Sequence, residues 1–132
     1  MNESVKKVLS EQLCYVATVG DGPNVVPIGF KEVRDDGTLL LADVGMNTTK
    51  NNIISNGQIA IAACDSSTRN TYMVKGTAEY IDSGEIVEYL NAKAEKMNLP
   101  FRAKGAVIVK PIKVIAKHPG PENNKEMDWP VF

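Results

Sequence analysis

Apolar and polar residues alternate along most of the chain, a pattern typical of short strands that bury one face and expose the other. Residues 58–64 are apolar on both faces, and we expect this strand at the centre of a sheet. An Asp-Gly turn within residues 34–37 predicts a hairpin between its flanking strands. The pattern predicts strands at residues 14–19, 24–33, 38–44, 58–64 and 71–81, and a final pair at 105–110 and 112–117 broken by Pro111.

Three other segments carry the marks of helices. Residues 3–13 repeat their apolar side chains at helical spacing, which predicts a short amphipathic helix. Residues 51–56 predict one or two helical turns that end at the following glycine. Residues 83–97 predict a longer helix with one apolar face, and Asp82 with Glu85 matches a capping box at its start.

These elements do not alternate as parallel βαβ units would, so the fold class is mainly β. We expect an antiparallel barrel with two or three helices packed outside it. The length of 132 residues corresponds to one domain. We assign residues 1–117 to that domain and residues 118–132 to a Pro-rich tail that packs on the domain or on a partner subunit.

Composition narrows the classes of function. The 15 basic and 16 acidic residues give a net charge of −1, which disfavours a nucleic-acid binder that relies on a positive field. Apolar runs are too short to span a membrane, and the first residues lack a signal-peptide core, so we expect a cytoplasmic protein. Cys14 and Cys64 lie in apolar segments and are expected to be buried, reduced thiols without a metal.

The predicted strand at residues 24–33 contains two residues that weaken strands. Alternation puts Pro27, Gly29 and Lys31 on one face, and Ile28 and Phe30 on the other, which is the core face. The first face would let a flat ligand approach the backbone while the lysine meets an anion. The other interpretation is an edge strand in which the proline prevents aggregation.

A second candidate site follows the strand at 38–44. Met46, Asn47, Thr48, Thr49 and Lys50 lead into the predicted helix, where free backbone N–H groups and the helix dipole favour anions. Hydroxyl groups and a lysine would complete a phosphate site. The other interpretation is an ordinary helix start, with Thr48 as the cap and Lys50 in solvent.

The tail holds the only tryptophan, Trp129. Disordered tails rarely combine Trp with Phe, as this one does. Trp129 therefore packs either on the surface of its own domain or over a site or partner subunit.

Residues 16–81 resemble the FMN-binding split-barrel family, which includes pyridoxamine 5′-phosphate oxidase and small FMN-binding proteins of anaerobic bacteria. The resemblance covers about half of the chain and rests on the order and spacing of its segments. These segments are GDGPNVVPIGFKEV, GTLLLADVG, MNTTKNNI, QIAIAAC and TYMVKGTAEYID.

The resemblance implies a six-stranded antiparallel split β-barrel of Greek-key type that forms a homodimer and binds FMN at the interface. It implies that the isoalloxazine lies along the second strand, with Lys31 in contact, and that the helix start at 48–50 holds the phosphate. It also implies that Thr71 reaches the flavin, and we expect Trp129 beside the partner's flavin. The full set of expected cofactor-binding residues is Pro27, Ile28, Gly29, Phe30, Lys31, Met46, Asn47, Thr48, Thr49, Lys50, Thr71 and Trp129.

The chain departs from the oxidase pattern at two points. Val26 stands where the oxidases carry an arginine, five residues before the strand lysine, and no Arg- and His-bearing motif follows Trp129. Both departures argue against oxidation of pyridoxamine phosphate. We expect an FMN-dependent oxidoreductase or electron-transfer protein, served by a nicotinamide nucleotide or a redox protein. The alternative is a non-catalytic binding module for FMN, haem or a deazaflavin.

Overall fold

The computed structural model describes residues 1–132 and contains three helices and seven strands. The helices are α1 (Glu3–Glu11), α2 (Thr48–Asn56) and α3 (Glu85–Lys96). The strands are β1 (Cys14–Gly20), β2 (Gly22–Ile28), β3 (Lys31–Val33), β4 (Leu39–Asp43), β5 (Gln58–Cys64), β6 (Thr71–Ile81) and β7 (Gly105–Ala116).

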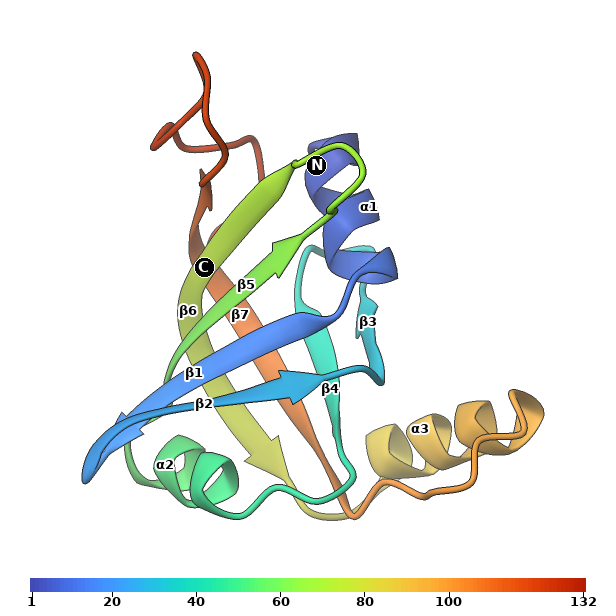
Figure 1. Cartoon of the computed structure of the whole chain (residues 1–132). Coiled ribbons are helices and arrows are strands. Elements are labelled where there is room, and N and C mark those ends of the chain that lie inside the picture. The colour runs from blue at the N-terminus through green and yellow to red at the C-terminus, as the bar shows by residue number, and fades with distance from the viewer.

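All seven strands form one antiparallel sheet in the order β2-β1-β5-β6-β7-β4-β3. The sheet curls into a barrel that stays open between its two edge strands, β2 and β3 (Figure 1). The expected mainly β split barrel with peripheral helices is therefore confirmed, with seven strands in place of six.

The predicted single strand at residues 24–33 is in fact two strands at opposite edges of the sheet. The chain leaves β2 after Ile28, and β3 begins at Lys31. The carbonyl of Phe30 accepts a hydrogen bond from the N–H of Ala42 at 3.0 Å, which ties the crossing segment to the neighbouring strand β4. Local alternation did not reveal this break because apolar residues continue through it.

Two apolar clusters hold the fold together. The larger fills the barrel, and α1 closes one end of it with Val5, Val8 and Leu9. The smaller lies between α3 and the outer side of β4, where Leu40 and Ala42 are buried. Strand β4 is thus the strand buried on both faces.

The strand expected to be central, β5, does lie inside the sheet, between β1 and β6. Its outward residues Ala62 and Cys64 are nevertheless exposed. The expectation that both cysteines are buried is therefore wrong for Cys64. Its apolar neighbours form an outward sheet surface that no helix covers, whereas Cys14 faces the core.

Other element boundaries differ from the prediction for local reasons. Strand β7 runs continuously through Pro111, where the pairing with β6 shifts register next to Gly76. A Cβ at Gly76 would lie 2.5 Å from the carbonyl oxygen of Lys110, so this close approach requires glycine. The capping box of Asp82 does not form, because the N-cap of α3 is Gly84 and no side chain caps it.

The tail packs on its own barrel. Trp129 is buried, and its indole N–H donates to the carbonyl of Gly37 at 2.9 Å. The N–H of Asn2 donates to the carbonyl of Asp128 at 2.8 Å, so the two ends of the chain meet. No helix of the structure combines the length and apolarity needed to cross a membrane.

Candidate functional site

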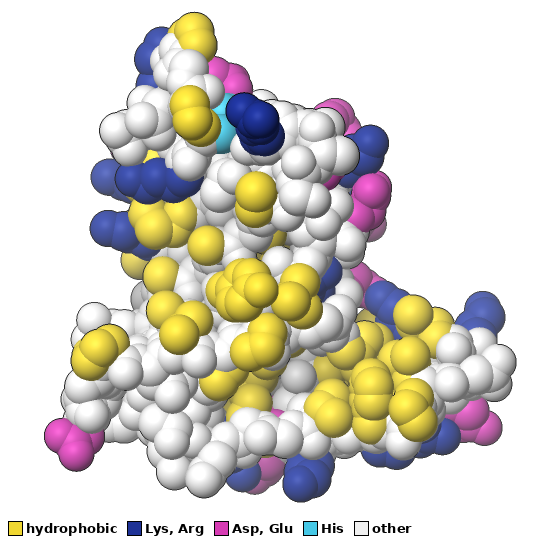
Figure 2. Space-filling view, in the orientation of Figure 1, with side chains coloured by type: hydrophobic (Ala, Val, Ile, Leu, Met, Phe, Trp, Pro, Cys, Tyr) yellow, Lys and Arg dark blue, Asp and Glu magenta, His cyan; other side chains and the backbone are white.

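A cavity of about 710 Å³ lies between α2, the crossing from β2 to β3, and the segment that follows α3. This volume is within the range of small-molecule and cofactor sites. Figure 2 shows hydrophobic side chains gathered over the sheet and over the α3 side of the same face. The cavity is lined only by uncharged residues: Asn24, Val26, Pro27, Ile28, Gly29, Phe30, Ala42, Val44, Gly45, Met46, Asn47, Thr48, Thr49, Met97, Leu99 and Phe101.

The polar end of the cavity is the N-terminus of α2. The N-cap is Asn47, whose side chain makes no capping hydrogen bond, so the alternative interpretation with Thr48 as the cap is wrong. The backbone N–H groups of Thr48, Thr49 and Lys50 donate to no acceptor in the protein. Helix starts leave such donors unpaired, and here they stand at a cavity lined by two threonines.

Asp43 holds the loop that leads into α2. Its carboxylate accepts hydrogen bonds from the N–H of Met46, at 2.7 Å, and from the hydroxyl of Tyr80. Burial, and then the hydrogen bond to Asp43, raise the pKa of Tyr80 well above its ordinary value, so its hydroxyl remains a donor. The ammonium of Lys50 lies 4.8 Å from the centre of the Tyr80 ring, a cation–π contact.

A neutral hydrogen-bond network lies beneath α2. Asn24 on β2 donates from Nδ2 to Oγ1 of Thr49 at 3.0 Å and to Oγ1 of Thr18 at 3.3 Å. Asn52 donates from Nδ2 to the same Thr18 oxygen at 3.1 Å. Thr18, Thr49 and Asn52 are buried, while Asn24 is half-buried at the cavity wall.

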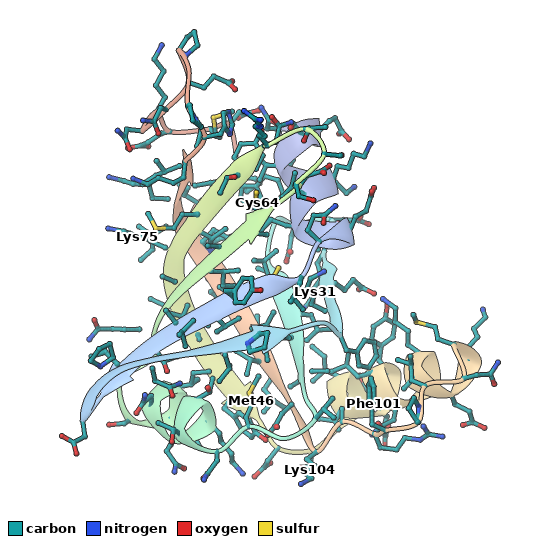
Figure 3. The ribbon with its side chains drawn as sticks, viewed as in Figure 1. Lys31, Met46, Cys64, Lys75, Phe101 and Lys104 are labelled. Atoms are coloured by element: carbon teal, nitrogen blue, oxygen red, sulfur yellow. The ribbon has the colours of Figure 1, made fainter.

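The opposite end of the cavity is apolar. Met97, Leu99 and Phe101 line it from the segment after α3, and the ring of Phe101 lies 6.0 Å from that of Phe30. Figure 3 shows Met46 and Phe101 below β2, on the α2 and α3 sides respectively. Asn91 of α3 fixes the segment, because its side chain exchanges two hydrogen bonds with the backbone of Ala103.

An ion pair attaches α3 to β3. The carboxylate of Glu32 accepts from the ammonium of Lys93 at 2.7 Å and from the hydroxyl of Tyr89. Burial alone would raise the pKa of Glu32, but the hydrogen bonds from Lys93 and Tyr89 outweigh it and lower this pKa. Glu32 is therefore a carboxylate at neutral pH.

Two glycines of the cavity wall are not required by the fold. Gly29 and Gly45 have no left-handed backbone. A Cβ added at Gly29 would meet only Leu13, at 3.9 Å, and one added at Gly45 would meet nothing within 4 Å. Neither strain nor packing explains glycine at these positions, but both keep side chains out of the cavity.

Eight of the twelve expected cofactor-binding residues line this single cavity. They come from the two segments that the sequence singled out, Pro27–Phe30 and Met46–Thr49. The structure thus brings together the end of β2 and the start of α2, which are separated in the chain by β3 and β4.

The other four expected residues lie elsewhere within the subunit. Lys31 donates from Nζ to the carbonyl of Ser10, at 2.9 Å, at the end of α1, and Figure 3 shows it on that side. Lys50 stacks on Tyr80, and Trp129 is buried in the core of its own barrel. Thr71 starts β6 on the outward face of the sheet, and its N–H donates to Nδ1 of His118 at 3.0 Å.

The sequence prediction missed Asn24 and the apolar segment from Met97 to Phe101. Asn24 stands next to a turn, where a polar residue has an ordinary explanation. Leu99 and Phe101 carried a usable signal, because they follow the predicted helix in a stretch that nothing else required to be apolar. Met97 was explained as the last residue of the apolar face of that helix.

Comparison with known proteins gives a consistent result. The family model described as pyridoxamine 5′-phosphate oxidase matches residues 1–119. Protein MJ0282 of Methanocaldococcus jannaschii is 31% identical over 129 residues, which cover 95% of this chain and 86% of that protein.

Two solved structures illustrate the likeness in three dimensions. HupZ of Group A Streptococcus is 27% identical, with a TM-score of 0.83 over 92% of this chain and 98% of that chain. An FMN-binding protein of Syntrophomonas wolfei has a TM-score of 0.70 over 82% of this chain and 78% of that chain, and at 16% identity it shares the fold alone. From the match over residues 1–119 and the relative of 31% identity, we conclude that the chain belongs to the pyridoxamine 5′-phosphate oxidase family.

Proposed function

We propose that the protein binds FMN in the cavity and serves as an oxidoreductase or electron-transfer protein. The observation that carries this proposal is the division of the cavity into a donor-rich end at α2 and an apolar remainder. FMN divides in the same way, into a doubly charged phosphate and a flat ring with a large apolar surface. Membership of the family supports the assignment.

The residues at the start of α2 fit a phosphate group. The free N–H groups of Thr48, Thr49 and Lys50 would donate to its oxygens, and the helix dipole favours the negative charge. The hydroxyls of the two threonines would add further donors. Lys50 contributes positive charge at this end while its ammonium remains over Tyr80.

The remainder of the cavity fits a flat ring. Gly29 and Gly45 leave the wall free of side chains, and Phe30 and Phe101 supply aromatic surface. The backbone N–H groups of Gly29 and Phe30 donate to no protein acceptor. We expect these N–H groups to meet the polar edge of the isoalloxazine.

We propose that a second copy of the chain completes the site. The outward face of strands β2, β1, β5, β6 and β7 is not covered by a helix. One residue from each strand lies next to its partner on the neighbouring strand, so that the five form a row across this face that starts at the cavity wall on β2. Its members are all apolar: Pro27, Tyr15, Ala62, Met73 and Ile115.

Exposure of this row supports the homodimer. Tyr15 is 52% exposed and Val25, on the next row, is 63% exposed, which is unusual for a contiguous sheet face of a monomer. Figure 2 shows hydrophobic side chains in the middle of this face. Thr71 lies on the same outward face, so it would approach the partner rather than its own cavity.

When bound, FMN would supply transfer of a hydride or of single electrons. The residues of this chain would bind the phosphate, orient the ring and exclude water from its apolar side. Because every residue that lines the cavity is uncharged, the protein's part is binding and orientation. A nicotinamide nucleotide or a redox protein would serve as electron donor.

The test is titration of the purified protein with FMN, followed by absorption and fluorescence, and then by anaerobic addition of NADH or NADPH. We expect saturable binding near one FMN per chain and bleaching of the flavin bands by a donor. A protein that ignores FMN would refute the proposal. Binding without reduction by any donor would favour a storage or sensing module over an oxidoreductase.

A further inference from the structure

Asn24 sets the direction of one hydrogen bond at the polar end of the cavity. Its Nδ2 donates to Oγ1 of Thr49 at 3.0 Å, so that the Thr49 oxygen acts as the acceptor. A hydroxyl has one proton to donate as well as lone pairs to accept with. No protein acceptor receives the proton of Thr49, although the side chain is 2% exposed and lines the cavity.

The start of α2 therefore presents a cluster of donors to the cavity. The three unpaired N–H groups of Thr48, Thr49 and Lys50 stand together with the Thr49 hydroxyl, whose proton Asn24 leaves free. A phosphate dianion accepts from all of them at once. A hydroxyl in its place accepts from one or two and leaves the other donors without a partner once the ligand displaces water, which is how polar sites reject close analogues.

We propose that Asn24 is a positioning residue that makes the cavity select the phosphorylated cofactor over its unphosphorylated form. The inference rests on the proposed function, because it takes FMN and riboflavin as the pair to be discriminated. Asn24 acts through Thr49, by fixing the Thr49 hydroxyl as a donor.

The neighbouring Asn52 shows that Asn24 is not needed merely to satisfy the buried network. Asn52 already donates to Thr18 at 3.1 Å, and the Asn24 contact to Thr18 is longer, at 3.3 Å. Asn52 is buried and makes no bond to Thr49, and its amide oxygen lies where a Cβ on Gly20 would be. Asn52 supports the packing of α2, whereas Asn24 faces the cavity.

The experiment measures Kd for FMN and for riboflavin and follows their ratio, since a general loss of folded structure weakens both alike. Asn24→Leu removes the donor, and Asn24→Asp replaces it with a charged acceptor for the Thr49 proton. We expect the ratio of the two Kd values, which measures the preference for FMN, to fall about five-fold in Asn24→Leu and about 100-fold in Asn24→Asp. Asn51→Asp is the matched control, because it adds the same charge to an exposed position of α2 and should leave the ratio within about two-fold.

A double-mutant cycle tests whether Asn24 acts through Thr49. In a Thr49→Val background the further change Asn24→Leu should leave the ratio unchanged, because the hydroxyl is already gone. Equal effects of Asn24→Leu in both backgrounds would overturn the inference. The inference would also be overturned if the wild type binds FMN and the Asn24 variants keep the wild-type ratio of the two Kd values. A wild type that binds neither flavin would instead refute the proposed function, and the inference with it.

Discussion

Helices α2 and α3 flank the same cavity, but they are attached to the sheet by different interactions. Helix α2 rests on buried, neutral amides and hydroxyls, and Asn56 adds a hydrogen bond to the carbonyl of Val19 at 2.7 Å. Helix α3 packs its apolar face on β4, and its polar attachment is the half-exposed ion pair of Glu32 with Lys93.

The two kinds of attachment differ in how precisely they fix a helix. Hydrogen bonds between neutral buried groups are directional and do not respond to pH or salt, so α2 presents its donors in a fixed arrangement. Apolar contacts are non-directional, and a partly exposed ion pair is weak and sensitive to screening. The polar end of the cavity at α2 is therefore held by directional bonds, whereas the packing of α3 on the sheet is mainly apolar.

The largest expected effect comes from a negative charge at the phosphate end. Thr48→Asp should lower FMN affinity about 100-fold, because a carboxylate would face the phosphate. Stability should hold or rise, because a carboxylate in the first turn suits the helix dipole. Titration calorimetry and thermal unfolding measure the two effects. Ser55→Asp, exposed at the other end of α2, is the control and should leave affinity within about two-fold.

A matched pair of tyrosines compares the two helices directly. Tyr80 donates to Asp43 on the α2 side, and Tyr89 donates to Glu32 on the α3 side. Tyr80→Phe should lower FMN affinity about ten-fold, because the loop before α2 loses its anchor. Tyr89→Phe should change affinity less than about two-fold. Equal effects in a binding titration would remove the distinction between the attachments of α2 and α3.

A smaller effect is expected from filling the cavity wall. Gly45→Ala should raise stability by about 0.4–1 kcal/mol, because the backbone tolerates alanine and the unfolded chain loses freedom. The same change should lower FMN affinity about three-fold, since the methyl group occupies cavity space. Denaturant unfolding and flavin titration would show these opposite signs. A variant that gains stability with undiminished affinity would place the ring away from Gly45.

The smallest effect concerns pH and the attachment of α3. The folded state lowers the pKa of Glu32 below its ordinary value of 4.5, so the ionised side chain stabilises the fold above that value. The stabilisation is lost as pH falls through the folded-state pKa. Glu32→Gln should therefore cost about 1 kcal/mol at pH 7 and nothing at strongly acidic pH. A cost that does not vary with pH would show that the charge is unimportant.

The sequence predicted the site best where local signals decide the outcome. The helix-start pattern selected Thr48 and Thr49, which line the cavity. Alternation assigned Ile28 and Phe30 to the core face, and only the family resemblance placed these two cavity residues at the cofactor. Local signals depend on neighbours in the chain alone. The openness of the barrel followed from the family resemblance and not from alternation, and the strand order was not predicted.

The features that the sequence prediction missed depend on contacts between residues far apart in the chain. Met97 and Phe101 line the cavity because α3 packs against β4, more than forty residues earlier in the chain. Lys31 matches the family position, yet its ammonium lies at the end of α1, which only the tertiary arrangement brings near. Cys64 looked buried because a strand bordering an uncovered apolar face has the same composition as a strand inside a core.

The contrast between the two cysteines has a practical consequence. Burial raises the pKa of Cys14 to about 11, so at neutral pH this thiol is protonated and inaccessible to reagents. Cys64 is exposed on the outward face of β5, two residues after Ala62, and it pairs with Thr71 on β6. The natural chain therefore carries a single addressable thiol, and a maleimide dye or spin label would report on whatever covers this face without any engineered cysteine.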